Sequence, residues 1–341
     1  MNHDFNRRDM LKATAAGLAS TGLTTGLGSW VLAAQEDSPD GIPKRPLGDT
    51  GEKVSIIGVG GYHIGTFKEL KDSIAMMHEA IDEGVTFFDN AWDYMNGKCE
   101  EWMGEALKQG NRREKVFLMT KVCDRHYEGA KQHLEDSLRR LQTDHIDLWQ
   151  FHEINYPDDP EWVFEKGGLK AALEAQKAGK IRFIGFTGHK DINIHLEMIN
   201  RGFHWDACQM PINIMDAHYR SFQKEVVPVC VGRKIGVVGM KGLAGGALVR
   251  DGNLSAIDCR RYALSLPVST LVCGMASREN LQQDVAVARG FQPMSDEEMQ
   301  AFLAKTRSAG SMGQLERFKT TRGYDGRYHQ QQHRTELEDV G

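Results

Sequence analysis

The chain has 341 residues, of which 40% are hydrophobic and 26% are charged, so it can bury a large core. The formal net charge is −5, and the lysines and arginines are scattered along the chain, so we expect no nucleic-acid partner. The six cysteines form no C-x-x-C pair and the thirteen histidines include no H-E-x-x-H motif, so neither a metal site nor a disulfide framework is predicted.

The first segment differs in composition from the rest. It carries the paired Arg7 and Arg8 in "NRRDMLK", then a mildly apolar run rich in glycine and threonine, and small residues at Ala33 and Ala34. This pattern indicates an export signal over residues 1–34, cleaved between residues 33 and 35, with retention as a membrane anchor as the alternative. The arginine pair resembles a twin-arginine signal, which implies export of the folded protein to a bacterial periplasm by the twin-arginine machinery.

After a polar linker at residues 35–43, short apolar runs alternate with helical segments. A hairpin with its turn at residues 48–51 leads into an apolar run at residues 54–59. Seven further apolar runs follow, separated by segments of helical periodicity: residues 85–89, 115–121, 146–152, 181–188, 205–210, 235–241 and 268–274. This alternation predicts eight parallel strands.

Eight strand–helix units in about 250 residues predict a closed (β/α)8 TIM barrel, with an N-terminal β-hairpin, over residues 44–306. A doubly wound open sheet is the alternative. The glycines of "GVGGYHIG", at positions 58, 60, 61 and 65, lack the G-x-G-x-x-G spacing with which such a sheet binds a dinucleotide. Residues 307–341 are polar, and we expect a tail that lies over the barrel or is partly disordered.

Polar side chains stand at the ends of three adjacent predicted strands. Asp89 ends the second strand and Tyr94 follows it, Lys121 ends the third, and His152 ends the fourth. In this architecture the strand ends gather on the face that carries the active site. Each residue alone has a structural explanation, such as capping a helix or packing on the rim. Together they predict one pocket in which a buried Lys121 pairs with Asp89.

The predicted chemistry follows from the lysine and the phenol. An ammonium about 4 Å away contributes on the order of 4 kcal/mol at an effective dielectric near 20, so we expect the pKa of Tyr94 to fall even after Asp89 and solvent reduce the effect. Tyr94 then donates a proton to an oxygen that becomes an alkoxide and that His152 holds. Such a reaction, without a metal or a covalent nucleophile, is hydride addition to a carbonyl from a cofactor.

The pattern "FFDNAWDY-x2-G-x2-E-x2-MGEAL", with "LMTK" and "WQFH" after it, resembles the aldo-keto reductase family over roughly residues 44–290. The resemblance implies a catalytic tetrad at Asp89, Tyr94, Lys121 and His152. It also implies an NADP(H)-dependent oxidoreductase that acts on a small carbonyl or alcohol: an aldehyde, a ketone or a sugar-like substrate. The alternatives are a nicotinamide-binding sensor with little turnover and an enzyme that retains its nicotinamide and recycles it within one turnover.

The resemblance also implies where the nicotinamide half of the cofactor binds. Its contacts fall on Thr187 and Gln209, while Gly188 takes the usual place of an asparagine, so that contact is lost or passes to His189. Met240 stands where an aromatic ring often stacks on the nicotinamide. The pyrophosphate loop falls on "GMKGLAGG", with candidate residues Gly242, Leu243, Ala244 and Gly245.

The segment "LVCGMASRENLQQD" matches the adenosine-phosphate region of the family only in outline. Gly274 stands where many members have a lysine for the 2'-phosphate, and Asn280 replaces a later arginine. Arg278, together with Ser277, is the candidate for this phosphate, because a guanidinium binds phosphate through two parallel hydrogen bonds. We therefore predict NADP as the cofactor, with NAD as the alternative.

Overall fold

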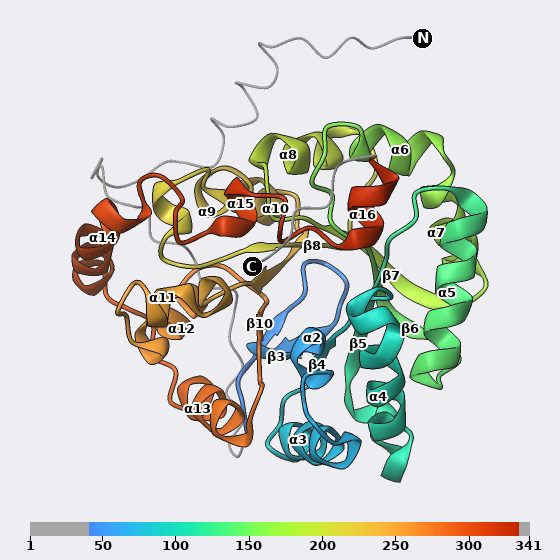
Figure 1. Cartoon of the computed structure of the whole chain (residues 1–341), viewed down its shortest axis with the longest axis horizontal. Coiled ribbons are helices and arrows are strands. Elements are labelled where there is room, and N and C mark those ends of the chain that lie inside the picture. The colour runs from blue at the N-terminus through green and yellow to red at the C-terminus, as the bar shows by residue number, and fades with distance from the viewer. Residues whose placement is uncertain (1–40, 334–341) are drawn as a thin grey trace. The chain divides into compact units, whose positions relative to one another are not determined.

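The structure is a computed structural model that describes residues 41–333 (Figure 1). The predicted export signal at residues 1–34 and the end of the predicted tail at residues 334–341 lie outside the described residues. Within residues 41–333, none of the helices combines the length and the apolar character that crossing a membrane requires.

Eight parallel strands close into a barrel, which confirms the predicted fold. The strands pair in the order β10-β3-β4-β5-β6-β7-β8-β9, and β10 also pairs with β9 to close the ring. They are β3 (Ile57–Gly60), β4 (Phe87–Asp89), β5 (Phe117–Val122), β6 (Ile146–Phe151), β7 (Ile181–Thr187), β8 (Ala207–Pro211), β9 (Gly236–Met240) and β10 (Thr270–Cys273). Nearly all of their side chains are buried, as expected for strands with a filled barrel on one side and helices on the other.

The N-terminal hairpin consists of two antiparallel strands, β1 (Lys44–Pro46) and β2 (Lys53–Ser55). It divides the predicted run at residues 54–59, so the first barrel strand begins only at Ile57. The Ser55 hydroxyl donates a hydrogen bond to the Ile57 carbonyl at 2.7 Å, which turns the chain out of the hairpin. Leu47 and Val54 pack in one cluster with the inward-facing Phe87, so the hairpin fills the end of the barrel opposite the strand ends.

Helices surround the barrel and alternate with its strands (Figure 1). The longer ones are α3 (Leu70–Asp82), α4 (Lys98–Leu107), α5 (Tyr127–Leu141), α7 (Gly168–Lys177), α8 (Ile192–Asn200), α12 (Ala256–Leu264), α13 (Arg278–Arg289) and α14 (Asp296–Gly310). The shorter ones are α2 (Gly61–Ile64), α6 (Asp159–Glu165), α9 (Phe222–Glu225), α10 (Val227–Gly232), α11 (Ala247–Arg250), α15 (Arg317–Thr320) and α16 (Arg327–Gln332). Their apolar faces and the outward-facing strand residues form the main hydrophobic core.

The alternation of side chains along each strand brings polar groups to the inside of the barrel. Met119 and Leu148 belong to the cluster of inward-facing apolar residues. Because strand side chains alternate, Lys121, two residues after Met119, and His152, four residues after Leu148, point to the same inner side. Asp89 reaches this side in the same way from β4. Above the apolar layers, the barrel therefore ends in a ring of polar groups.

The C-terminal part of the described chain lies over the mouth of the barrel. The predicted end of the barrel domain at residue 306 falls within α14, and the chain continues through α15 and α16 (Figure 1). The buried Lys319 ammonium pairs with Asp216 Oδ1 at 2.6 Å and with Glu316 Oε2 at 2.8 Å. Asp325 Oδ2 pairs with Lys190 at 2.9 Å. These pairs fix residues 316–325 to the loops after β7 and β8.

Candidate active site

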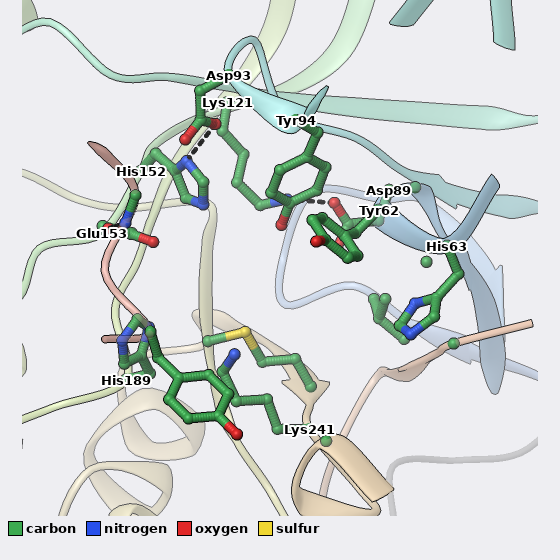
Figure 2. A pocket seen from close by; sticks show the side chains of 18 of the residues that line it. Tyr62, His63, Asp89, Asp93, Tyr94, Lys121, His152, Glu153, His189 and Lys241 are labelled. Atoms are coloured by element: carbon green, nitrogen blue, oxygen red, sulfur yellow. Dashed lines mark hydrogen bonds and ion pairs between the residues drawn. The ribbon is translucent and has the colours of Figure 1, made fainter. Parts of the chain in front are cut away.

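A cavity of about 1240 Å³ opens at the carboxyl ends of the strands, where this architecture places its sites. Its lining comes from the carboxyl ends of β3, β4, β5, β7, β9 and β10, from the loops after most of them and after β6, and from residues 323–328 and Gln331 of the C-terminal segment. All four side chains of the predicted tetrad line it. Figure 2 shows the Lys121 side chain running past the Tyr94 ring toward Asp89, with His152 on the opposite side of that ring from Asp89.

Lys121 is the centre of the tetrad and is almost completely buried. Its ammonium contacts Asp89 Oδ1, donates a hydrogen bond to the Asn90 carbonyl at 2.6 Å, and lies 3.4 Å from the Tyr94 hydroxyl. Asp89 Oδ2 accepts a hydrogen bond from Gln209 Nε2 at 2.8 Å. The buried cation is therefore paired with an anion that is itself hydrogen-bonded, which is the condition under which a protein tolerates a buried charge.

Tyr94 begins a short 3-10 turn, η1 (Tyr94–Gly97), that directs its ring into the cavity. Met95 and Asn96 in this turn have φ angles of 48° and 56°, an uncommon conformation for residues other than glycine. The Tyr94 ring meets Tyr62 and His152 edge-on, with centroids 5.6 and 5.5 Å away. Contacts on two sides therefore hold the phenol beside Lys121.

The expected lowering of the Tyr94 pKa is not found. Burial raises the pKa of Tyr94 well above its usual value, and the negative charge of Asp89 raises it further. The reason is that Asp89 contacts the same ammonium and offsets its charge, while burial disfavours the phenolate. Without a bound ligand, the Tyr94 side chain is a neutral phenol at physiological pH.

His152 is buried beside two residues that the sequence did not single out. Its Nδ1 lies 3.0 Å from Asp93 Oδ1 and 3.7 Å from Cys123 Sγ. Burial lowers the pKa of His152, so the ring is neutral at pH 7, although Asp93 opposes this shift. Figure 2 shows the second ring nitrogen turned away from Asp93, toward the open side of the pocket. That nitrogen can meet a substrate oxygen.

The predicted nicotinamide-side residues lie at the same end of the barrel. The predicted residues that line the cavity are Thr187, Met240, Gly242, Leu243, Gly245 and Gly274. Ala244 is not one of the lining residues. Gln209 contacts Asp89 through its Nε2 group. Its Oε1 atom is buried and has no hydrogen-bond partner in the described part of the chain.

The position after Thr187 admits only glycine. A Cβ at Gly188 would stand 2.4 Å from the Ile154 carbonyl oxygen, so the asparagine that the family resemblance implies cannot fit here. His189 follows and lines the cavity, but its Nε2 faces Asp325 Oδ1 at 3.2 Å. Burial lowers the pKa of His189 to about 3, so this ring is neutral.

The structure does not bring Arg278 and Ser277 to the cavity. Arg278 is exposed on the first turn of α13 and pairs with Glu79 Oε2 at 2.7 Å, while the Ser277 hydroxyl accepts the Asn280 N–H at 3.3 Å as the helix cap. The 2'-phosphate site on Arg278 therefore stays a prediction, and the geometry does not support it. Instead, Arg260 of α12 and Asn280 line this end of the cavity.

Arg260 was missed because it lies on the helix before β10 and not in the segment that the family pattern marks. Its guanidinium is held by Asp284 through contacts of 2.8 and 3.3 Å, and its NH1 is close to Gly242, where an added Cβ would stand 2.9 Å away. Arg260 thus offers a fixed cation beside the glycine-rich loop that follows β9.

The sequence also gave no signal for three charged residues in the cavity. Glu153 follows His152, Lys241 follows β9, and Asp325 comes from the C-terminal segment. Burial raises the pKa of Glu153 well above its usual value, and Asp93 and Asp325 raise it further. Burial lowers the pKa of Lys241, with Glu153 acting in the opposite direction. The cavity therefore carries many polar groups beyond the tetrad.

The fold and this site define an oxidoreductase. The model of the aldo/keto reductase family matches residues 56–259, and the chain belongs to this family. It is similar to the uncharacterized oxidoreductase YrpG of Bacillus subtilis (strain 168), with 34% identity over 226 residues that cover 59% of this chain and 67% of the relative. It is also similar to L-galactose dehydrogenase of Arabidopsis thaliana, with 28% identity over 224 residues, 62% of this chain and 68% of that enzyme.

Solved structures show the same fold. The aldo-keto reductase AKR11C1 from Bacillus halodurans in its holo form has a TM-score of 0.65 and 25% identity, covering 80% of this chain and 99% of that one. An aldo/keto reductase from Klebsiella pneumoniae, in complex with NADP and acetate, has a TM-score of 0.64 and 24% identity, covering 77% of this chain and 94% of that one.

Proposed function

We propose that the protein is an NADP(H)-dependent oxidoreductase that interconverts a small carbonyl compound and the corresponding alcohol, with Tyr94 as the proton donor in reduction. The observation that carries the proposal is the buried contact of Lys121 with both Asp89 and the Tyr94 hydroxyl, which stands 3.4 Å away. A module that only binds a nicotinamide gains nothing from a buried lysine beside a phenol, so this arrangement favours turnover over sensing.

The residues present fit a nicotinamide cofactor. The unpartnered Oε1 of Gln209 is a buried acceptor next to the tetrad, which suits the amide N–H of a carboxamide group. Loop residues Gly245 and Gly246, at φ angles of 66° and 88°, allow the backbone after β9 to turn tightly beside Arg260, which suits a phosphate. When bound, the reduced nicotinamide supplies the hydride.

The protonation state of Tyr94 favours the reduction of a carbonyl over the oxidation of an alcohol. A Tyr94 with a raised pKa keeps its proton through neutral pH, and it can still protonate an alkoxide, which is a much stronger base than a phenolate. Lys121 stabilises the phenolate that remains after the transfer. His152 and Tyr94 hold the carbonyl oxygen between them before the transfer, and oxidation of an alcohol requires the phenolate and therefore a higher pH.

We further propose a polyhydroxylated substrate. Hydrogen-bonding side chains line the cavity together with aromatic rings: Tyr62, Trp92, Glu153, His189, Lys241, Tyr324, Arg327, Tyr328 and Gln331. Buried polar groups left without partners disfavour an apolar ligand, so this lining selects a substrate with several hydroxyls. The similarity to L-galactose dehydrogenase supports a sugar-like substrate, and the NADP complex of the Klebsiella pneumoniae structure supports NADP.

The test is a substrate panel followed by NADPH absorbance in reduction and by NADP+ reduction in the reverse direction. The panel contains aldoses, ketoses and sugar alcohols, with benzaldehyde as an apolar control. We expect turnover on at least one polyhydroxylated compound in preference to benzaldehyde, and loss of turnover in Tyr94→Phe with cofactor binding retained. Equal activity of Tyr94→Phe would reject its role as the acid. A preference for benzaldehyde would reject the substrate class alone.

We also propose export by the twin-arginine pathway, supported by Arg7 and Arg8 ahead of a weakly apolar run. A dinucleotide enzyme gains from export in the folded state, because it can acquire its cofactor in the cytoplasm. Replacing both arginines by lysine should leave active protein in the cytoplasm, and the measurement is activity in the periplasmic and cytoplasmic fractions. Normal export of the double variant would contradict the proposal.

A further inference from the structure

Four potential metal ligands meet beside the tetrad. They are Asp93 in the loop after β4, Cys123 after β5, His152 after β6, and His329 on α16. Each offers one ligand atom, and these atoms all lie within 4.8 Å of one another. Cys123, His152 and His329 are buried, so this is not a chance gathering of solvated surface groups. It lies outside every short sequence motif, because its successive members are 30, 29 and 177 positions apart along the chain.

His329 supplies an independent observation that points to a ligand. It is fully buried, yet neither of its ring nitrogens has a hydrogen-bond partner within residues 41–333. The Glu153 carboxylate is 3.9 Å from Nε2, which is too long for a hydrogen bond. Asp93 Oδ1 approaches His152 but makes no well-aligned hydrogen bond. Buried polar atoms are normally paired, and an unpaired set pointing at one spot is typical of a site for an ion.

The separations suit tetrahedral coordination. Bonds of about 2.0–2.3 Å to nitrogen, oxygen and sulfur at zinc place neighbouring ligand atoms about 3.4–3.6 Å apart. His152 Nδ1 lies 3.0 Å from Asp93 Oδ1 and 3.7 Å from Cys123 Sγ. The widest separations must close by about 1 Å around an ion, a shift within the reach of side-chain rotation at His329.

We propose that Asp93, Cys123, His152 and His329 bind one divalent metal ion, with zinc as the metal that best fits. A thiolate and two imidazoles select zinc and its transition-metal neighbours over magnesium and calcium, which require oxygen ligands. The thiolate and the carboxylate balance the two positive charges of the ion. The Glu153 carboxylate, 3.9 Å from His329 Nε2, can orient that ring when the ion is bound.

A metal ion at this site would also affect the proposed reduction. This consequence rests on the proposed function, whereas metal binding itself does not. When the proton of the neutral His152 ring sits on Nδ1 and faces the Asp93 carboxylate, the other ring nitrogen has only a lone pair and cannot donate to a carbonyl oxygen. A metal on Nδ1 leaves the proton on Nε2, which faces the open pocket (Figure 2). The metal thus fixes the tautomer that can hold the substrate oxygen.

The experiment measures metal binding to the full-length protein without cofactor or substrate. Protein stripped with a chelator is titrated with Zn²⁺ against a chromophoric competitor, and we expect one ion per chain. Cys123→Ser and His329→Ala should each weaken binding by at least roughly 10- to 100-fold, because losing even a group that only hydrogen-bonds to a metal ligand costs that much. Loaded with Co²⁺ instead, the protein should show a thiolate charge-transfer band that Cys123→Ser abolishes.

Two control variants separate loss of a ligand from loss of packing. Cys259→Ser changes another buried free cysteine on α12, and His333→Ala removes the ring at the end of α16 that stacks on Trp162. Both should bind zinc like the parent. Sub-stoichiometric zinc in the parent, or parent-like affinity in Cys123→Ser, would overturn the proposal. If His329→Ala fails to fold, the zinc affinity of the near-isosteric Cys123→Ser variant tests the proposal by itself. Neither the zinc titration nor the Co²⁺ absorption band depends on reductase activity. The metal site can therefore be refuted while the proposed function stands, and the reverse.

Discussion

Replacing Lys121 by methionine removes the charge next to the proposed acid while keeping the length of the side chain. The ammonium is 3.4 Å from the Tyr94 hydroxyl, a separation worth about 5 kcal/mol of Coulomb energy for a phenolate at an effective dielectric near 20. Asp89 contacts the same ammonium and cancels part of this stabilisation. If about half remains, reduction should slow by about 100-fold, or about 2.7 kcal/mol.

The assay is kcat for NADPH oxidation on the best substrate of the panel, measured from pH 6 to 9, with the NADPH dissociation constant followed by fluorescence. Lys121→Met also leaves a buried, unpaired Asp89, which costs about 3–5 kcal/mol of stability. The double variant with Asp89→Asn removes that stability effect and serves as the control. In the Tyr94→Phe background, Lys121→Met should cost less than about threefold, because the lysine acts through the phenol. A full additional loss in that background would refute this reasoning.

Three further predictions concern the cofactor and the fold. Gln209→Leu should weaken NADP(H) binding by about 1–3 kcal/mol, because the buried Oε1 acceptor is lost; an unchanged dissociation constant would place the carboxamide elsewhere. Arg278→Ala should change NADPH and NADH binding by less than about 0.5 kcal/mol, because its partner is Glu79 on the surface; a tenfold loss for NADPH alone would restore the phosphate role. Burial lowers the pKa of His195 to about 4, so the unfolded chain binds a proton at this ring before the folded chain does. The free energy of unfolding should therefore fall by about 1.4 kcal/mol per pH unit through this ring as the pH falls from 6.5 toward 4. Urea unfolding of His195→Gln should show a smaller loss over this range, and a pH dependence identical to that of the parent would contradict the lowered pKa.

The sequence was sufficient for the parts of the site that depend on strand periodicity. Alternation along the strands brings Asp89, Lys121 and His152 to the inside of the barrel, and the apolar runs mark where each strand ends. Gln209 reaches the same layer for the same reason. Boundaries were less certain: the hairpin takes Val54 and Ser55 away from the first barrel strand, because a local side-chain hydrogen bond redirects the chain there.

The remainder depends on contacts between distant parts of the chain, which periodicity does not encode. His329 and Asp325 come from a polar segment with no strand or helix signal of its own, and only the folded chain brings them over the barrel mouth. Arg278 lies between Gly274 and Asn280, the two positions at which the family resemblance implies phosphate-binding residues, but it pairs with Glu79 at the surface. The direction of the Tyr94 pKa shift depends on how far Asp89 offsets Lys121 and how deeply the phenol is buried, and both need coordinates.

The most direct measurement of the central claim is the transfer of deuterium from NADPH labelled at C4 of the reduced nicotinamide to the carbonyl carbon of the substrate, followed by mass spectrometry of the alcohol product. The parent protein should yield an alcohol that carries one deuterium, and Tyr94→Phe, although it still binds NADPH, should yield almost none in the same time. Deuterium transfer by Tyr94→Phe at the parent rate, or an alcohol product without deuterium from the parent, would contradict hydride transfer with Tyr94 as the acid.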